Sequence, residues 1–153
     1  VINTYPAEEL ERIIRDYGEE RRARRVVRAI VDRRPILWAS QLARVVEEAV
    51  GRFRGRVHPA TRVFQALRIY VNRELDNLAQ VLPQAVSLLM PGGRLVAISY
   101  HSLEDRMVKQ FFKNRKDSIR VVVRKVIRPS REEVISNPRS RSAKLRVGER
   151  LAV

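Results

Sequence analysis

The stretch PGGRLVAISYHSLEDRMVKQFF, residues 91–112, decides the fold class of this chain. After its Pro-Gly-Gly turn, the mostly apolar run Arg94–Tyr100 predicts a short buried strand. Ser102 is followed three residues later by Asp105, a capping-box spacing that predicts a helix to about Lys113. A strand that leads directly into a helix indicates an α/β fold.

The residues after this stretch predict two more strands and one short helix. The β-branched run Ile119–Ile127 predicts a strand, and the weakly alternating run Lys144–Val153 predicts the last one. Between them, Ser130 and Glu133 form a second capping box on a helix that Asn137-Pro138 ends. The second half of the chain is therefore expected to follow the order β-α-β-α-β.

The residues before the stretch have the spacing of amphipathic helices. The expected buried stripes are Leu10–Ile13–Ile14–Tyr17, Ala23–Val26–Val27–Ile30–Val31, Leu42–Val45–Val46–Ala49 and Phe64–Leu67–Val71–Leu75–Leu78. The first two stripes are interpreted as one helix interrupted at Gly18, and Ser40 is expected to cap the second helix, Pro59 to open the third, and Pro83 to begin a fourth. We therefore expect a helical domain over residues 1–82 and an α/β domain over residues 83–153.

The charge balance predicts a polyanionic partner. The chain has 32 Lys and Arg against 17 Asp and Glu, which gives a net charge of +15. Its 44% hydrophobic content is sufficient for a core, and the absence of cysteine excludes disulfides, a thiolate nucleophile and Cys-ligated metal sites. The sequence has no membrane-span or signal-peptide pattern, so we expect a cytoplasmic protein that binds nucleic acid.

Three motifs, in this order, resemble the MraW family of bacterial ribosomal RNA small subunit methyltransferases. They are HPATRVFQALRIYVNREL (residues 58–75), the stretch quoted above, and NPRSRSAKLR (residues 137–146). The likeness extends to NTYPAEEL and YGEERRARR near the start, with small departures at Tyr100 and Ser140. It implies an S-adenosylmethionine-dependent enzyme that methylates the N4 amine of a cytidine in the 16S rRNA decoding centre.

The resemblance also implies that the cofactor site lies mainly in an N-terminal half that this sequence lacks. The family holds the cofactor with a Gly-rich loop after its first strand, whereas Gly92 and Gly93 lie in a predicted helix-to-strand turn. Because the chain also begins at Val1, we expect a C-terminal fragment: a helical insertion domain and about three strands of a Rossmann-like class I methyltransferase sheet. Strand 94–100 should then keep an unpaired edge.

Candidate site residues come from three segments. At the carboxyl end of strand 94–100, where α/β sheets bind ligands, His101 and Arg106 are candidates for RNA or substrate contact, because Ser102 and Asp105 are expected to serve the cap. The further candidates for RNA contact are His58, Arg62, Arg68, Asn72, Arg139, Arg141 and Lys144. For Arg62, Arg68 and Asn72, ion pairs with Glu74 and Asp76 are an equal alternative.

Other features remain more ambiguous. The Arg21–Arg28 run is either a solvated helical face or a phosphate-binding one. Phe53, if exposed, could stack on a base, but burial is the commoner outcome for both Phe53 and Trp38. Two histidines far apart without cysteine make a metal site unexpected. No residue is assigned as a catalyst.

Three functional hypotheses follow. The first is an enzyme fragment, inactive alone, that binds 16S rRNA or the small ribosomal subunit, forms one wall of the methylation site and joins a missing N-terminal half. The second is a stand-alone basic RNA- or DNA-binding module, marked by a salt-dependent affinity without cofactor response. The third is an interaction piece that docks onto a separately encoded cofactor-binding half. The sequence leaves the oligomeric state open.

Overall fold

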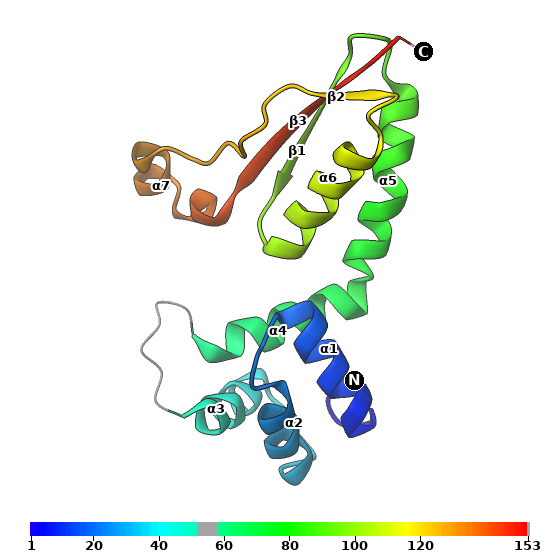
Figure 1. The fold of residues 1–153 in the computed structure, drawn as a ribbon. Coiled ribbons are helices and arrows are strands. Elements are labelled where there is room, and N and C mark those ends of the chain that lie inside the picture. The colour runs from blue at the N-terminus through cyan, green and yellow to red at the C-terminus, as the bar shows by residue number, and fades with distance from the viewer. Residues whose placement is uncertain (52–57, 153) are drawn as a thin grey trace. The chain divides into compact units, whose positions relative to one another are not determined.

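The computed structural model describes residues 1–51 and 58–152, and the chain divides into two compact units, Val1–Glu74 and Leu75–Val153 (Figure 1). The predicted roles of Phe53 and of the end of the last strand at Val153 fall outside the described residues. Among the described helices, none combines the length and the apolar character that crossing a membrane requires.

The described part of the first unit contains four helices, and the apolar stripes on either side of Gly18, which the prediction assigns to one interrupted helix, lie on two of them. The four helices are α1 (Ala7–Gly18), α2 (Ala23–Asp32), α3 (Ala39–Val50) and α4 (Pro59–Asn72). Their buried side chains form a cluster that includes Leu10, Val26 and Val46. The predicted cap at Ser40 is wrong, because α3 begins at Ala39 and Gln41 Oε1 accepts hydrogen bonds from the backbone N–H groups of Leu37 and Trp38. Trp38 itself is 69% exposed.

The predicted buried stripe of α4 is wrong. Val63, Ala66 and Ile69 are buried, whereas Phe64 is 36% and Val71 61% exposed. The reason is a close approach of α1, where a Cβ added to Gly18 would lie 2.7 Å from the Arg62 carbonyl oxygen and 3.3 Å from Ala66 Cβ. Such a contact selects small residues, so the largest apolar side chains of α4 do not mark its buried face.

The second unit contains three strands and three α-helices. Its elements are α5 (Glu74–Leu88), β1 (Arg94–Ser99), α6 (Ser102–Asn114), β2 (Ile119–Val121), α7 (Arg131–Ser136), the 3₁₀-helix η1 (Pro138–Ser142) and β3 (Lys144–Arg150). Pro83 lies inside α5 and does not begin a helix, contrary to prediction. The expected boundary between residues 82 and 83 is therefore within α5, whereas the division into units follows Glu74. The fold is mixed α/β.

The sheet has the order β1-β3-β2, with β3 antiparallel to both neighbours. The predicted strand Ile119–Ile127 is only partly correct, because regular pairing ends at Val121 and resumes as a single bridge between Ile127 and Leu145. In the described sheet β1 pairs only with β3, so its other edge has no strand partner.

One face of this sheet is covered by helix. Phe112 and Val108 of α6 form a small buried cluster with Ile119 of β2 and with two residues of α5. On the opposite face, Val96 and Ile98 of β1 are 53% and 55% exposed. In β1 they alternate with Leu95 and Ala97, which pack against the covered cluster.

Candidate nucleic-acid interface

The junction between β1 and α6 is organised by His101. Its Nδ1 accepts a hydrogen bond from the Glu104 backbone N–H (3.3 Å), and Glu104 Oε2 accepts one from the His101 backbone N–H (3.2 Å). The capping box therefore consists of His101 and Glu104, and the predicted Ser102–Asp105 pair is wrong. His101 and Glu104 have the same three-residue spacing as Ser102 and Asp105, so the sequence alone allows either pair to form the capping box. The observed backbone places His101 at the N-cap and Ser102 at the first helical position.

This arrangement lowers the pKa of Glu104 below its usual range. Partial burial alone would raise its pKa, but the adjacent His101 side chain and the hydrogen bond from the Tyr100 backbone N–H (2.8 Å) lower the pKa to about 2. His101 Nε2 lies 3.3 Å from Glu104 Oε1 and is buried without a well-aligned hydrogen bond among the described residues. His101 is thus a buried capping residue, and it is not exposed for RNA contact.

Asp105 joins α6 to the start of β3. Its two carboxylate oxygens accept hydrogen bonds from Arg146 at 2.6 and 3.2 Å, and Lys144 Nζ lies 3.6 Å away. Burial alone would raise the pKa of Asp105, but the Arg146 guanidinium lowers it below its usual range. Lys144, a predicted RNA contact, therefore has an acidic partner within the chain.

The 3₁₀-helix before β3 presents two of the predicted arginines. Arg139 and Arg141 are exposed, and the described residues give neither of them an ion pair. Since Lys144 pairs with Ser99, the start of β3 and the carboxyl end of β1 lie at the same end of the sheet. The structure thus brings the Asn137–Arg146 segment next to the β1–α6 junction, which also carries the exposed Arg106 on α6.

The predicted residues of the first unit are engaged in local contacts. His58 caps α4 by accepting from the Ala60 N–H (3.1 Å), and Arg62 lies 3.6 Å from Glu20. Arg68 forms a bidentate pair with Glu74 at 2.8 and 3.1 Å, and Asn72 also donates to Glu74 at 3.3 Å. Of the two alternatives, the structure gives Arg68 the ion pair.

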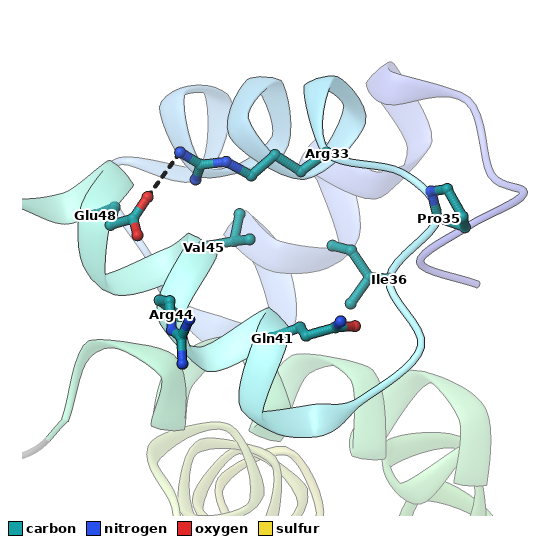
Figure 2. A pocket seen from close by; sticks show the side chains of 7 residues that line it. All are labelled: Arg33, Pro35, Ile36, Gln41, Arg44, Val45 and Glu48. Atoms are coloured by element: carbon teal, nitrogen blue, oxygen red, sulfur yellow. Dashed lines mark ion pairs between the residues drawn. The ribbon is translucent and has the colours of Figure 1, made fainter.

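A pocket of about 240 Å³ lies on the first unit beside α3 (Figure 2). Arg33 reaches across it to Glu48 at 2.7 Å, so the two charges neutralise each other. Figure 2 shows Arg44 and Gln41 on the α3 side and Pro35 and Ile36 on the preceding segment. With one arginine already paired, this pocket offers a phosphate little net attraction.

A larger pocket of about 550 Å³ lies on the second unit, and the sequence analysis missed it. Its lining, as far as the described residues form it, has no carboxylate and six cations: Lys109, Lys113, Lys116, Arg120, Arg124 and Arg146. Three of the lysines recur at positions i, i+4 and i+7 along α6 and just beyond it, a spacing that places them on one side of the helix. That spacing was the signal available in the sequence.

The described residues do not fit the cofactor-binding loop that the methyltransferase resemblance implies. Gly92 and Gly93 lead from α5 into β1, and Gly92 has a positive φ of 82° in this turn. A nucleotide-binding glycine loop instead leads from a strand into a helix. We assign no cofactor contact to these residues.

Comparison with known proteins decides the family. The model of the MraW methylase family matches residues 1–151. The chain belongs to the MraW methylase family. It is 52% identical to a ribosomal RNA small subunit methyltransferase H of Dehalococcoides mccartyi, over 99% of this chain and 48% of that protein. The same name is given to relatives in Coprothermobacter proteolyticus (54% identity, 96% of this chain, 50% of the relative) and Thermomicrobium roseum (49% identity, 99% and 53%).

This MraW-family chain spans about half the length of the curated relatives it matches. Membership confirms the resemblance drawn from the three sequence motifs.

Proposed function

We propose that this chain is the rRNA-binding part of an S-adenosylmethionine-dependent methyltransferase that acts on the N4 amine of a decoding-centre cytidine in 16S rRNA. The observation that carries the proposal is the match of the MraW methylase family over residues 1–151. The net charge of +15 supports a polyanionic substrate, and a cytoplasmic location is part of the proposal.

The reaction makes positioning the main task of the protein. The lone pair of a cytosine N4 amine is delocalised into the ring, so the amine must be held in line with the methyl group that S-adenosylmethionine supplies. The target base must also be unpaired and turned into a pocket. In this proposal the Asn137–Arg146 segment and Arg106 bind the RNA backbone near the carboxyl end of β1. His101 and Glu104 fix the start of α6 as one wall of the site.

The rest of the site is proposed to come from the half that the longer relatives contain. The unpaired edge of β1 and the exposed side chains of Val96 and Ile98 support this division. A strand of the other half would extend the sheet beside β1. The proposed partner is then either part of the same polypeptide or a separate chain.

The experiment combines this chain with the N-terminal half of the Coprothermobacter proteolyticus relative. Methyl transfer from S-adenosylmethionine to small ribosomal subunits is measured, and the modified nucleotide is located by mass spectrometry. We expect N4-methylcytidine only when both halves are present, with each half alone as control. Methylation at another atom, or none with both halves folded and associated, contradicts the proposal.

A binding measurement separates the proposal from a stand-alone nucleic-acid module. We expect this chain to bind 16S rRNA with a strong salt dependence, and Arg139→Ala with Arg141→Ala to weaken binding more than the charge-matched control Lys125→Ala with Arg128→Ala. Equal affinity for 16S rRNA, unrelated RNA and DNA would favour the general module.

A further inference from the structure

We propose that the larger pocket of the second unit binds the sugar–phosphate backbone of a single RNA strand, an inference that rests on the proposed rRNA-binding function. The pocket lies between α6 and β2 and has a volume of about 550 Å³. This volume lies within the range of ligand-binding clefts. We call it the basic pocket, and its lining cations are the six named above.

The walls of the basic pocket carry charge that the chain does not neutralise. Arg120 is paired with Glu149 at 2.6 Å and Arg146 with Asp105 at 2.6 Å. The other four cations, Lys109, Lys113, Lys116 and Arg124, have no ion pair with any residue that the structure describes, and all four are exposed. Cations that converge on one recess without acidic partners repel one another, and a bound polyanion removes that cost.

The two walls come from different elements. Lys109 and Lys113 are one helical turn apart on α6, about 6 Å along its axis. Lys116 follows the end of α6, and Arg120 and Arg124 lie on or just after β2 on the other side. Anchors on two sides of a recess match a chain that runs through it, with successive phosphates meeting successive cations.

The floor of the basic pocket is apolar. Val121 and Val123 are partly exposed there, above the buried side chains of Phe112 and Ile119. Aliphatic surface beside cations suits the ribose and base faces of an unpaired strand, whereas a phosphate ion alone would gain nothing from it. A duplex keeps its base faces stacked inside the helix and could not place them on this floor. Because Phe112 is buried, we expect little base stacking and little sequence preference.

The basic pocket also differs from the pocket of Figure 2. There, Glu48 pairs with Arg33 and the volume is about 240 Å³, so Arg44 is the one lining arginine that has no acidic partner among the described residues. The basic pocket has more than twice that volume, and none of the described residues that line it is a carboxylate. Charge complementarity therefore assigns the RNA strand to the second unit.

The test measures the affinity of the whole chain for a labelled single-stranded oligouridine and for 16S rRNA at several salt concentrations. The variant Lys109→Gln/Lys113→Gln/Lys116→Gln removes one wall while keeping good helix formers. Because each phosphate contact on a single strand contributes about 0.7 to the salt slope, we expect the slope to fall by about 2 and the low-salt affinity to fall about tenfold.

A charge-matched control removes three exposed cations of the same unit that do not line the basic pocket. In Lys125→Gln/Arg128→Gln/Arg131→Gln we expect a smaller change in slope and affinity. A second pocket variant, Val123→Glu, keeps all six cations but adds a carboxylate to the floor, and it should also weaken oligouridine binding. Circular dichroism confirms that each variant is folded.

The possible results separate the two proposals. If both pocket variants bind 16S rRNA with unchanged affinity and salt slope, the proposal that the basic pocket binds RNA is overturned, while the proposed RNA-binding function of the chain stands. If the unaltered chain binds neither RNA, both fail. Tighter binding of an RNA duplex through the same lysines, or binding of polyglutamate in place of RNA, would overturn the single-strand assignment.

Discussion

The two units of the chain use their side chains differently. In the described part of the helical unit Val1–Glu74, thirteen buried residues form one cluster, and the candidate cations Arg62 and Arg68 are paired with acidic residues of the same unit. In the unit Leu75–Val153, the buried cluster has five residues, and four cations of the basic pocket have no described acidic partner. The exposed Arg21, Arg24, Arg25 and Arg28 of the first unit also have no ion pair among the described residues, so the units differ in where such cations gather: along α2 and just before it in the first and around a recess in the second.

A smaller core buries less apolar surface, so we expect the second unit to have the lower free energy of unfolding. Apolar burial stabilises a fold in proportion to the area removed from water. The smaller cluster, the open sheet face at Val96 and Ile98 and the unpaired edge of β1 all belong to the second unit. We therefore expect the second unit to unfold first.

Removal of the Phe112 ring from the core of the second unit should have the largest effect on the free energy of unfolding. Phe112→Ala deletes a side chain that is 2% exposed and contacts the Gly148 region of β3, so we expect a loss of about 3–5 kcal/mol. Hydrogen exchange should show amides of β1, α6 and β3 deprotected while α1 stays protected. Leu10→Ala is the counterpart in the first unit. Equal loss of protection in both units after Phe112→Ala would contradict independent units.

The ion pair between α6 and β3 should come next. Arg146→Gln leaves Asp105 largely buried with only Lys144 nearby, and we expect a loss of about 3 kcal/mol from the second unit. Since the pKa of Asp105 is lowered in the folded state, its contribution is present at neutral pH and is lost as pH falls. Urea titrations should show less acid sensitivity in Arg146→Gln than in the unaltered chain. Arg94→Gln, at an exposed pair with Glu149, is the control with little effect.

Much of this comparison could be predicted from the sequence, and the exceptions have a physical reason. Strand Arg94–Ser99 and the helical first half follow from periodicity, and the unpaired strand edge follows from the family resemblance. The buried face of α4 does not follow from periodicity, because the contact of Gly18 with α4 depends on tertiary packing and selects Ala66 over Phe64. The His101 cap was missed because Ser and Asp are the usual capping residues, and the basic pocket because its walls lie on separate elements.

Two glycine-to-alanine substitutions compare how tightly the two units are packed. A Cβ at Gly18 would meet a backbone oxygen at 2.7 Å, which cannot move without shifting α4, so Gly18→Ala should cost the first unit about 1–3 kcal/mol. At Gly148 the nearest atoms, Ile119 Cγ2 at 2.9 Å and Phe112 Cε1 at 3.0 Å, belong to side chains that can shift. Gly148→Ala should therefore cost less, as measured by thermal unfolding. The reverse order would show that the small core of the second unit is the more rigid one.

The smallest expected effect concerns the cap of α6. Glu104→Gln keeps the shape of the side chain but removes the charge that accepts hydrogen bonds from the Tyr100 and His101 backbone N–H groups, and we expect a loss of about 0.5–2 kcal/mol at neutral pH. The pKa of Glu104 is lowered from 4.5 to about 2, so its contribution is complete above pH 4.5 and declines as pH falls towards 2. The stabilities of the variant and the unaltered chain should therefore converge over this range, measured by hydrogen exchange in α6. A constant difference at all pH values would mean that the Glu104 charge does not stabilise the cap, and that α6 is held by its packing on the sheet alone.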